Sequence, residues 1–109
     1  MIPVKGYNGK RVGVLGLGRT GLATASALEE GGAIPVCWDD NPASRALAEV
    51  EGFTVEDISR PREASALDLL VTSPGIPHLY PVAHKVIQAA WDAGVPVDND
   101  ISLFFQSFA

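Results

Sequence analysis

The hydrophobic pattern of the chain alternates between short apolar runs and longer segments with apolar residues at helical spacing. The apolar runs have the length of buried strands and lie at 12–15, 34–38, 53–55, 67–72 and 95–97. Helices are predicted at 22–30, 43–51 and 82–93, and a glycine follows each of them. The polar stretch 56–65 predicts a loop with one turn of helix. Strands and helices that alternate in this way imply an α/β domain with a parallel sheet and right-handed crossovers.

Two apolar patterns near the end of the chain predict packing surfaces. Within the helix at 82–93, a stripe suited to face the sheet contains Val86, Ile87, Ala90 and Trp91. The acidic stretch 98–100 is suited to cap a final segment with apolar residues at helical spacing: Ile101, Phe104, Phe105 and Phe108. We interpret Trp91 and Trp38 as packing residues rather than as platforms on which a ligand stacks.

Three glycines, Gly16, Gly18 and Gly21, lie between the first apolar run and the first helix. Gly16 permits backbone angles that a side chain would forbid, Gly18 lets phosphates approach the main chain, and Gly21 lets the helix lie close to the strand. Unpaired N–H groups at the start of a helix, together with its dipole, favour an anion. The motif predicts a nucleotide-type ligand, and a purely structural turn is the alternative. Arg19 faces either the phosphates or solvent.

Two acids, Asp39 and Asp40, end the second apolar run. An acid at the end of the second strand, about 20 residues past the glycine turn, usually binds a ribose hydroxyl, which is the role we expect for Asp39. The alternative is that Asp39, Asp40 and Asn41 cap the helix that begins at Pro42.

A turn-rich segment, Ser73-Pro74-Gly75-Ile76, follows the fourth apolar run. In an open parallel sheet, ligands bind outside the carboxyl ends of the strands, at the point where the strand order reverses. We therefore expect this segment on the same edge of the sheet as the glycine turn. Ser73 lacks the spacing of a hydrolase nucleophile, so we do not expect it to attack a substrate.

Composition and charge narrow the class of ligand. The chain has 109 residues and a net charge of −5, which argues against binding to nucleic acid. No apolar run approaches the ~20 residues that span a bilayer, and a secretion signal is absent from the start of the sequence, so we expect a cytoplasmic protein. The single cysteine, Cys37, is expected to be a buried small apolar residue. His78 and His84 lack a third ligand, so no metal site is expected.

The sequence lacks a phosphate loop for ATP. Gly9 and Lys10 are followed by Arg11 instead of serine or threonine, and no other Gly-Lys pair occurs. The glycine turn is therefore the one phosphate-binding motif that the sequence offers.

Three motifs, taken in order, resemble the N-terminal domain of the Mur ligases. They are the turn Gly16–Gly21, the segment Ser73–Ile76 followed by Pro81, and the stretch Asp100–Phe104. The resemblance extends over the chain from about residue 6. It implies a Rossmann-like three-layer α/β domain with a five-stranded parallel sheet, occupying residues 1–109 and excised from a longer three-domain ligase.

The resemblance also implies a substrate and its binding residues. The substrate would be UDP-N-acetylmuramoyl-L-alanine, to which the most similar branch of the family adds D-glutamate in cytoplasmic peptidoglycan synthesis. The diphosphate would lie at the first turn of the helix, the uracil and ribose at the end of the second strand, and the segment after the fourth strand would form the opposite wall. The residues implied are Gly16, Gly18, Arg19, Thr20, Gly21, Asp39, Asp40, Ser73, Pro74, Gly75 and Ile76.

The same resemblance assigns ATP and Mg²⁺ to the full-length enzyme and no cofactor to this chain. The partners implied are the central and C-terminal domains of the ligase, and neither nucleic acid nor a membrane is expected. We do not expect the chain to be catalytic alone, and the rings of Phe104, Phe105 and Phe108 would pack near the missing central domain. Two alternatives remain, namely an NAD-binding domain of an oxidoreductase and a stand-alone regulatory nucleotide-binding module.

Overall fold

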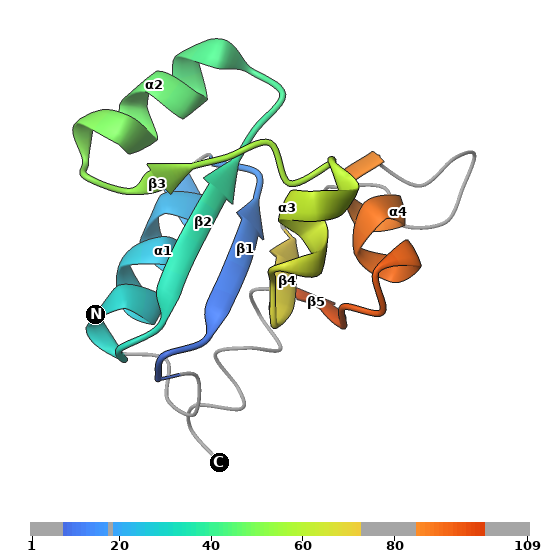
Figure 1. Ribbon diagram of the computed structural model, residues 1–109. Coiled ribbons are helices and arrows are strands. Elements are labelled where there is room, and N and C mark those ends of the chain that lie inside the picture. Colours follow the sequence, from blue (N-terminus) through green and yellow to red (C-terminus); the bar gives the residue numbers. More distant parts are fainter. Residues whose placement is uncertain (1–7, 18, 73–84, 100–109) are drawn as a thin grey trace.

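Five parallel strands form one sheet in the order β3-β2-β1-β4-β5 (Figure 1). The computed structural model describes residues 8–17, 19–72 and 85–99. The strands are β1 (Arg11–Leu15), β2 (Ile34–Trp38), β3 (Thr54–Val55), β4 (Leu69–Thr72) and β5 (Val97–Asn99). The predicted α/β class, with a five-stranded parallel sheet, is confirmed.

The helices cover both faces of this sheet and make a three-layer arrangement. They are α1 (Arg19–Glu30), α2 (Pro42–Val50), α3 (Pro61–Ser65) and α4 (Lys85–Asp92). Figure 1 shows α1 behind the sheet and α3 and α4 in front of it. Helices thus lie between successive parallel strands, as crossover connections between parallel strands require.

The core is divided by the sheet into two apolar clusters. On the α1 side, Val12 and Val14 of β1 pack with Leu28 of α1 and Ala48 of α2. On the other side, Leu15 belongs to a cluster that also contains residues of α4 and of the segment before α3: Val36, Ile58, Leu67, Leu70, Val86, Ile87, Ala90 and Val95. Burial on both faces explains why the central strands β1, β2 and β4 are nearly continuous apolar runs without a polar alternation.

Several boundaries differ from the sequence prediction. Helix α1 begins at Arg19 instead of Leu22, and β4 begins at Leu69 instead of Leu67. The fifth strand is Val97–Asn99 and not 95–97, because Val95 N–H still donates to Ala90 O of α4 at 2.8 Å. Its partners are Leu70 to Thr72, so the position of β4 sets where β5 begins.

Asp98 and Asn99 are residues of β5, paired with Val71 and Thr72, and a cap on the final segment stays a prediction. One further expectation was wrong. Trp91 is 41% exposed, whereas Val86, Ile87 and Ala90 are buried against the sheet. With 3.6 residues per turn, Trp91 lies at the flank of that buried stripe and not at its centre. The final segment, 101–108, lies outside the described residues, as do His78 and His84.

Candidate functional site

The carboxyl ends of the three central strands are level. Leu15 of β1 lies in register with Trp38 of β2 on one side and with Thr72 of β4 on the other. The strand order reverses between β1 and β4, and this is where parallel α/β sheets bind ligands. The glycine turn leaves β1 at this edge, and Ser73–Ile76 comes directly after Thr72 in the chain. That segment, like Gly18, lies outside the described residues.

The glycine turn requires two of its glycines for different reasons. Gly16 has a φ of +93°, a conformation that residues with a side chain rarely adopt. A Cβ added to Gly21 would lie 1.8 Å from the carbonyl oxygen of Gly16 and 2.8 Å from its carbonyl carbon. The first turn of α1 therefore lies directly against the turn that precedes it. Both roles expected of these glycines in the backbone geometry are confirmed.

The first turn of α1 is electrostatically suited to an anion. None of its residues from Arg19 to Leu22 is acidic. Unpaired amides and the positive end of the helix dipole occur at such a terminus. This placement agrees with the anion site that the sequence predicts, and occupancy by a diphosphate stays a prediction.

The Asp39 carboxylate connects the end of β2 to the glycine turn. Its Oδ2 accepts a hydrogen bond from Leu17 N–H at 2.7 Å, and its Oδ1 accepts one from Asn41 N–H at 2.8 Å. Each oxygen has a second lone pair, so the carboxylate is able to accept a further bond from a ligand. A contact between Asp39 and a nucleoside stays a prediction.

The capping alternative is confirmed for Asn41 and not for Asp39. Asn41 is the N-cap of α2, and its Oδ1 accepts a hydrogen bond from Ala43 N–H at 3.0 Å, with Pro42 at the first helical position. Asp40 is exposed beside this cap. The three residues after β2 therefore differ in role: Asp39 binds the glycine turn, Asp40 is exposed, and Asn41 caps α2.

Arg45 of α2 was missed by the sequence interpretation. Its Nη1 donates to the Asp39 carbonyl oxygen at 2.7 Å, and its Cζ lies 4.5 Å from the ring centroid of Trp38. The only signal in the sequence is spacing, since a residue four positions after an N-cap lies one turn into the helix, on the side of the cap. Trp38 packs against the core, as expected, and its buried Nε1 has no acceptor among the described residues.

Cys37 is buried next to these residues in β2. Burial, with a smaller contribution from the negative charge of Glu29, raises the pKa of the thiol from 9.0 to about 12. A thiol with this pKa is protonated at neutral pH and is a poor nucleophile. The interpretation of Cys37 as a buried apolar residue is confirmed.

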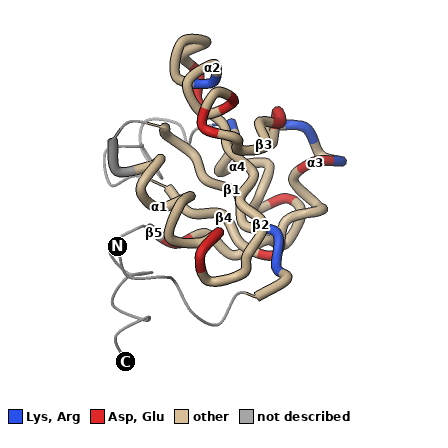
Figure 2. Tube along the Cα trace, turned by 90° about the vertical axis from the view of Figure 1, so that its left-hand side faces the viewer, with Lys and Arg blue, Asp and Glu red and all other residues tan. Residues whose placement is uncertain are grey.

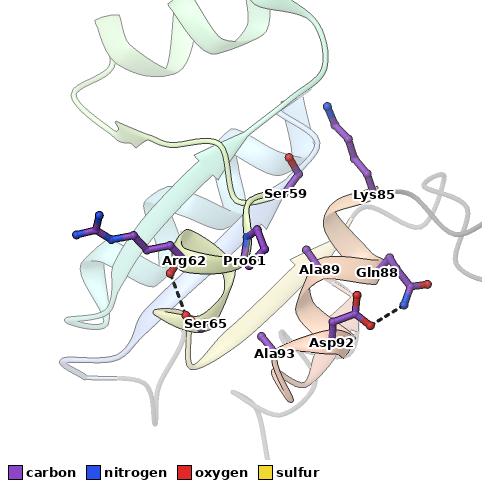
Figure 3. A pocket seen from close by; sticks show the side chains of 9 residues that line it. All are labelled: Ser59, Pro61, Arg62, Ser65, Lys85, Gln88, Ala89, Asp92 and Ala93. Atoms are coloured by element: carbon purple, nitrogen blue, oxygen red, sulfur yellow. Dashed lines mark hydrogen bonds between the residues drawn. The ribbon is translucent and has the colours of Figure 1, made fainter.

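A surface groove with a volume of about 600 Å³ lies between α3 and α4 (Figure 3). Pro61, Ala89 and Ala93 give it apolar walls, and Gln88 Nε2 donates to Asp92 Oδ1 at 3.0 Å on its rim. Figure 3 shows the Arg62 side chain turned away from the groove, so the polar groups do not converge on one point. None of the predicted site residues that the structure describes lines it.

Three further observations concern the charges, the metal-ligating side chains and the helix lengths of the described residues. Basic and acidic positions are interspersed along α2 and α3 (Figure 2). Over the ranges 8–17, 19–72 and 85–99, no group of three His, Cys, Asp or Glu residues is arranged to hold a metal ion. In the same ranges no helix combines the length and the apolar character needed to cross a membrane.

The sheet order and the glycine turn define the chain as a Rossmann-like α/β domain. Solved structures agree with this class. A shikimate dehydrogenase from Aquifex aeolicus superposes with a TM-score of 0.63 at 16% identity, over 94% of this chain and 45% of that one. A D-lactate dehydrogenase from Salmonella has a TM-score of 0.58 at 25% identity, over 84% of this chain and 27% of that one. At this level of identity the likeness concerns the fold.

The chain belongs to the family described as Mur ligase MurD-like, N-terminal domain, whose family model matches residues 10–99. Proteins named UDP-N-acetylmuramoylalanine--D-glutamate ligase are 65% identical in Cereibacter sphaeroides and 62% identical in Ruegeria pomeroyi, over 109 residues. These matches cover 100% of this chain but only 23% of each relative. The resemblance to Mur ligases that the sequence motifs indicate is therefore confirmed.

Proposed function

We propose that this chain is the domain that binds the UDP part of UDP-N-acetylmuramoyl-L-alanine in an ATP-dependent, D-glutamate-adding ligase of peptidoglycan synthesis. The observation that carries the proposal is the glycine turn at the reversal point of the sheet, where a Cβ on Gly21 would meet the Gly16 carbonyl at 1.8 Å. Membership of the family supports the ligase and its substrate.

In this proposal the diphosphate binds at the start of α1. Main-chain amides of Gly18, Arg19, Thr20 and Gly21 donate to its oxygens, and the helix dipole favours its charge. The missing side chains at Gly16 and Gly21 keep the turn and the helix close together, so several amides converge on one anion. The Arg19 side chain lies beside the phosphates or in solvent.

The nucleoside end of the substrate is assigned to the end of β2. Asp39 accepts a hydrogen bond from the uracil or ribose through a lone pair that its two backbone bonds leave available. Asp40 lies beside it on the exposed side. The segment Ser73, Pro74, Gly75 and Ile76 closes the site from the end of β4.

The ligation itself is assigned to the rest of a longer protein. The chain spans 23% of the length of the relatives that it matches, and its sequence has no phosphate loop. ATP and Mg²⁺ are therefore bound by the central and C-terminal domains, which are also the partners of this domain. The proposal places the protein in the cytoplasm, where this step of peptidoglycan synthesis takes place.

Isothermal titration of the 109-residue chain with UDP and, separately, with NADH tests the proposed ligand. We expect UDP to bind more tightly than NADH, and uridine to bind more weakly than UDP because it lacks the diphosphate. Tighter binding of NADH would overturn the proposal in favour of an oxidoreductase domain. Equal affinity for uridine and UDP would remove the diphosphate from the glycine turn.

The coding sequence downstream of residue 109 tests the second part of the proposal. A Gly-x-x-Gly-Lys-Ser/Thr motif there is expected, because that loop binds the phosphates of ATP. A stop codon directly after residue 109 would instead favour the regulatory module.

A further inference from the structure

We propose that Arg45 is a positioning residue for the candidate site, which acts through Trp38 and Asp39 on the glycine turn. The inference rests on the proposed function, because it states how the turn that binds the diphosphate is kept in place. Arg45 itself does not contact the substrate in this proposal.

The position of Arg45 is set by the start of α2. Asn41 caps the helix through Ala43 N–H, and Pro42 at the first helical position fixes the backbone there. Arg45 follows one turn later, so its side chain returns over the end of β2. Its backbone N–H donates to Asn41 O at 3.2 Å, which ties this residue to the cap.

The Arg45 guanidinium makes two different contacts at once. Nη1 donates to Asp39 O at 2.7 Å, and the planar group lies over the Trp38 ring with Cζ 4.5 Å from its centroid. A planar cation is suited to stack on a ring and donate at its edge, whereas a lysine ammonium supplies only a point charge. Trp38 and Asp39 are therefore held together by one side chain.

The two residues held by Arg45 are the ones that hold the glycine turn. Trp38 O accepts a hydrogen bond from Gly16 N–H at 3.0 Å, and Asp39 Oδ2 accepts one from Leu17 N–H at 2.7 Å. Arg45 and the glycine turn thus contact the same two residues. A change in the guanidinium contacts shifts the acceptors of two successive amides in the turn.

Amide hydrogen exchange of Arg45→Gln and Arg45→Lys tests the link without any ligand. Loss of the stacked, bonded guanidinium should make the Leu17 amide exchange roughly tenfold faster in Arg45→Gln. Arg45→Lys keeps a donor and the charge, so we expect an intermediate rate. Unchanged exchange at Leu17 in Arg45→Gln would overturn the inference.

UDP titration of the same variants tests the consequence for binding. We expect Arg45→Gln to bind UDP roughly fivefold more weakly than the unchanged chain, with Arg45→Lys between them. Arg62→Gln removes an exposed arginine of α3 and controls for charge. Ala64→Gly destabilises α3, which carries no residue of this network, and controls for stability.

The outcomes separate the two claims. UDP binding that Arg45→Gln leaves unchanged, or that Ala64→Gly weakens equally, would overturn the positioning role. If the unchanged chain does not bind UDP at all, the proposed function fails, and Leu17 exchange alone then decides whether Arg45 positions the turn.

Discussion

The two edges of the sheet use glycine for different purposes. At the amino edge, where helices end and strands begin, Gly52 follows α2 and Gly94 follows α4, with φ of +91° and +75°. A Cβ added to either would have no heavy atom of the described residues within 4 Å. At the carboxyl edge, a Cβ on Gly21 would lie 1.8 Å from a main-chain oxygen. A Cβ on Gly32, at the same amino edge, would meet only the side chain of Asn8, which is able to move, whereas Gly21 faces main-chain atoms. The amino edge therefore needs a backbone conformation, and the carboxyl edge also needs close approach between main-chain atoms.

Hydrogen bonds follow the same division. At the amino edge, Asp68 Oδ2 accepts from Arg11 N–H at an exposed position, 2.9 Å away. At the carboxyl edge, Asp39 accepts from two backbone amides, and one of them belongs to the buried residue Leu17. The backbone at the carboxyl edge, to which the ligand is assigned, is therefore held by more contacts than the backbone at the amino edge.

Gly21→Ala should cause the largest loss of stability. The new methyl group would overlap the Gly16 carbonyl, which is backbone and has no side-chain rotation to relieve the contact. We expect the free energy of unfolding to fall by about 3 kcal/mol, measured by urea denaturation followed by circular dichroism. A midpoint equal to that of the unchanged chain would contradict the close packing of α1 on the turn.

Asp39→Ala should have the next largest effect. It leaves the amides of Leu17 and Asn41 without their acceptor, and we expect a loss of about 2 kcal/mol in the free energy of unfolding. Asp68→Ala removes a comparable bond at the exposed amino edge and is the matched control, with a loss of under about 1 kcal/mol. Equal losses in the two variants would show that the two edges do not differ.

Gly52→Ala should cost less than either change at the carboxyl edge. The added Cβ has space, and the cost comes from a left-handed backbone conformation, about 1 kcal/mol. Because Gly52 lies at the amino edge, UDP affinity should stay unchanged in a titration at a temperature where the chain is folded. Gly21 has no positive φ, so a cost as large as that of Gly21→Ala would show that close approach is no more demanding than backbone conformation.

The smallest expected effect is the change of the free energy of unfolding with pH. It tests the burial of Cys37 in the core between the two edges. Burial raises the pKa of Cys37 from 9.0 to about 12, so the folded state keeps a proton that the unfolded state loses. The stabilisation is complete below about pH 8, where the thiol is protonated in both states, and falls as the pH rises through 9.0 toward about 12. Between pH 8 and pH 9 we expect a loss of about 0.4 kcal/mol, measured by urea denaturation. Cys37→Ala should lack this slope, and the same slope in both proteins would exclude the thiol as its source.

Much of the fold could be predicted because the relevant signals are local. The bounds of β2 agree with its apolar run, and those of β1 differ only by Arg11, since strands buried on both faces are apolar almost without interruption. The bounds of β5 could not be predicted, because a strand of three residues has no period of its own. Its register is set by Leu70 to Thr72 of the neighbouring strand.

The candidate site divides in the same way. The motif Gly16-x-Gly18-x-x-Gly21 and the cap Asn41 could be predicted from residues a few positions apart. Whether Asp39 caps the helix or faces the turn could not, because its partner Leu17 is 22 residues away in the sequence. The role of Arg45 could not be predicted from a motif, because its stacking on Trp38 depends on how α2 packs at the end of β2.

The sequence alone determined the alternation of strands and helices, the glycine turn after the first strand and the cap of α2, because each depends on neighbours in the chain. The tertiary structure decided which amides the Asp39 carboxylate binds and what the Arg45 guanidinium contacts. These side chains choose partners by distance in space, and that distance exists only after β1, β2 and α2 have packed together.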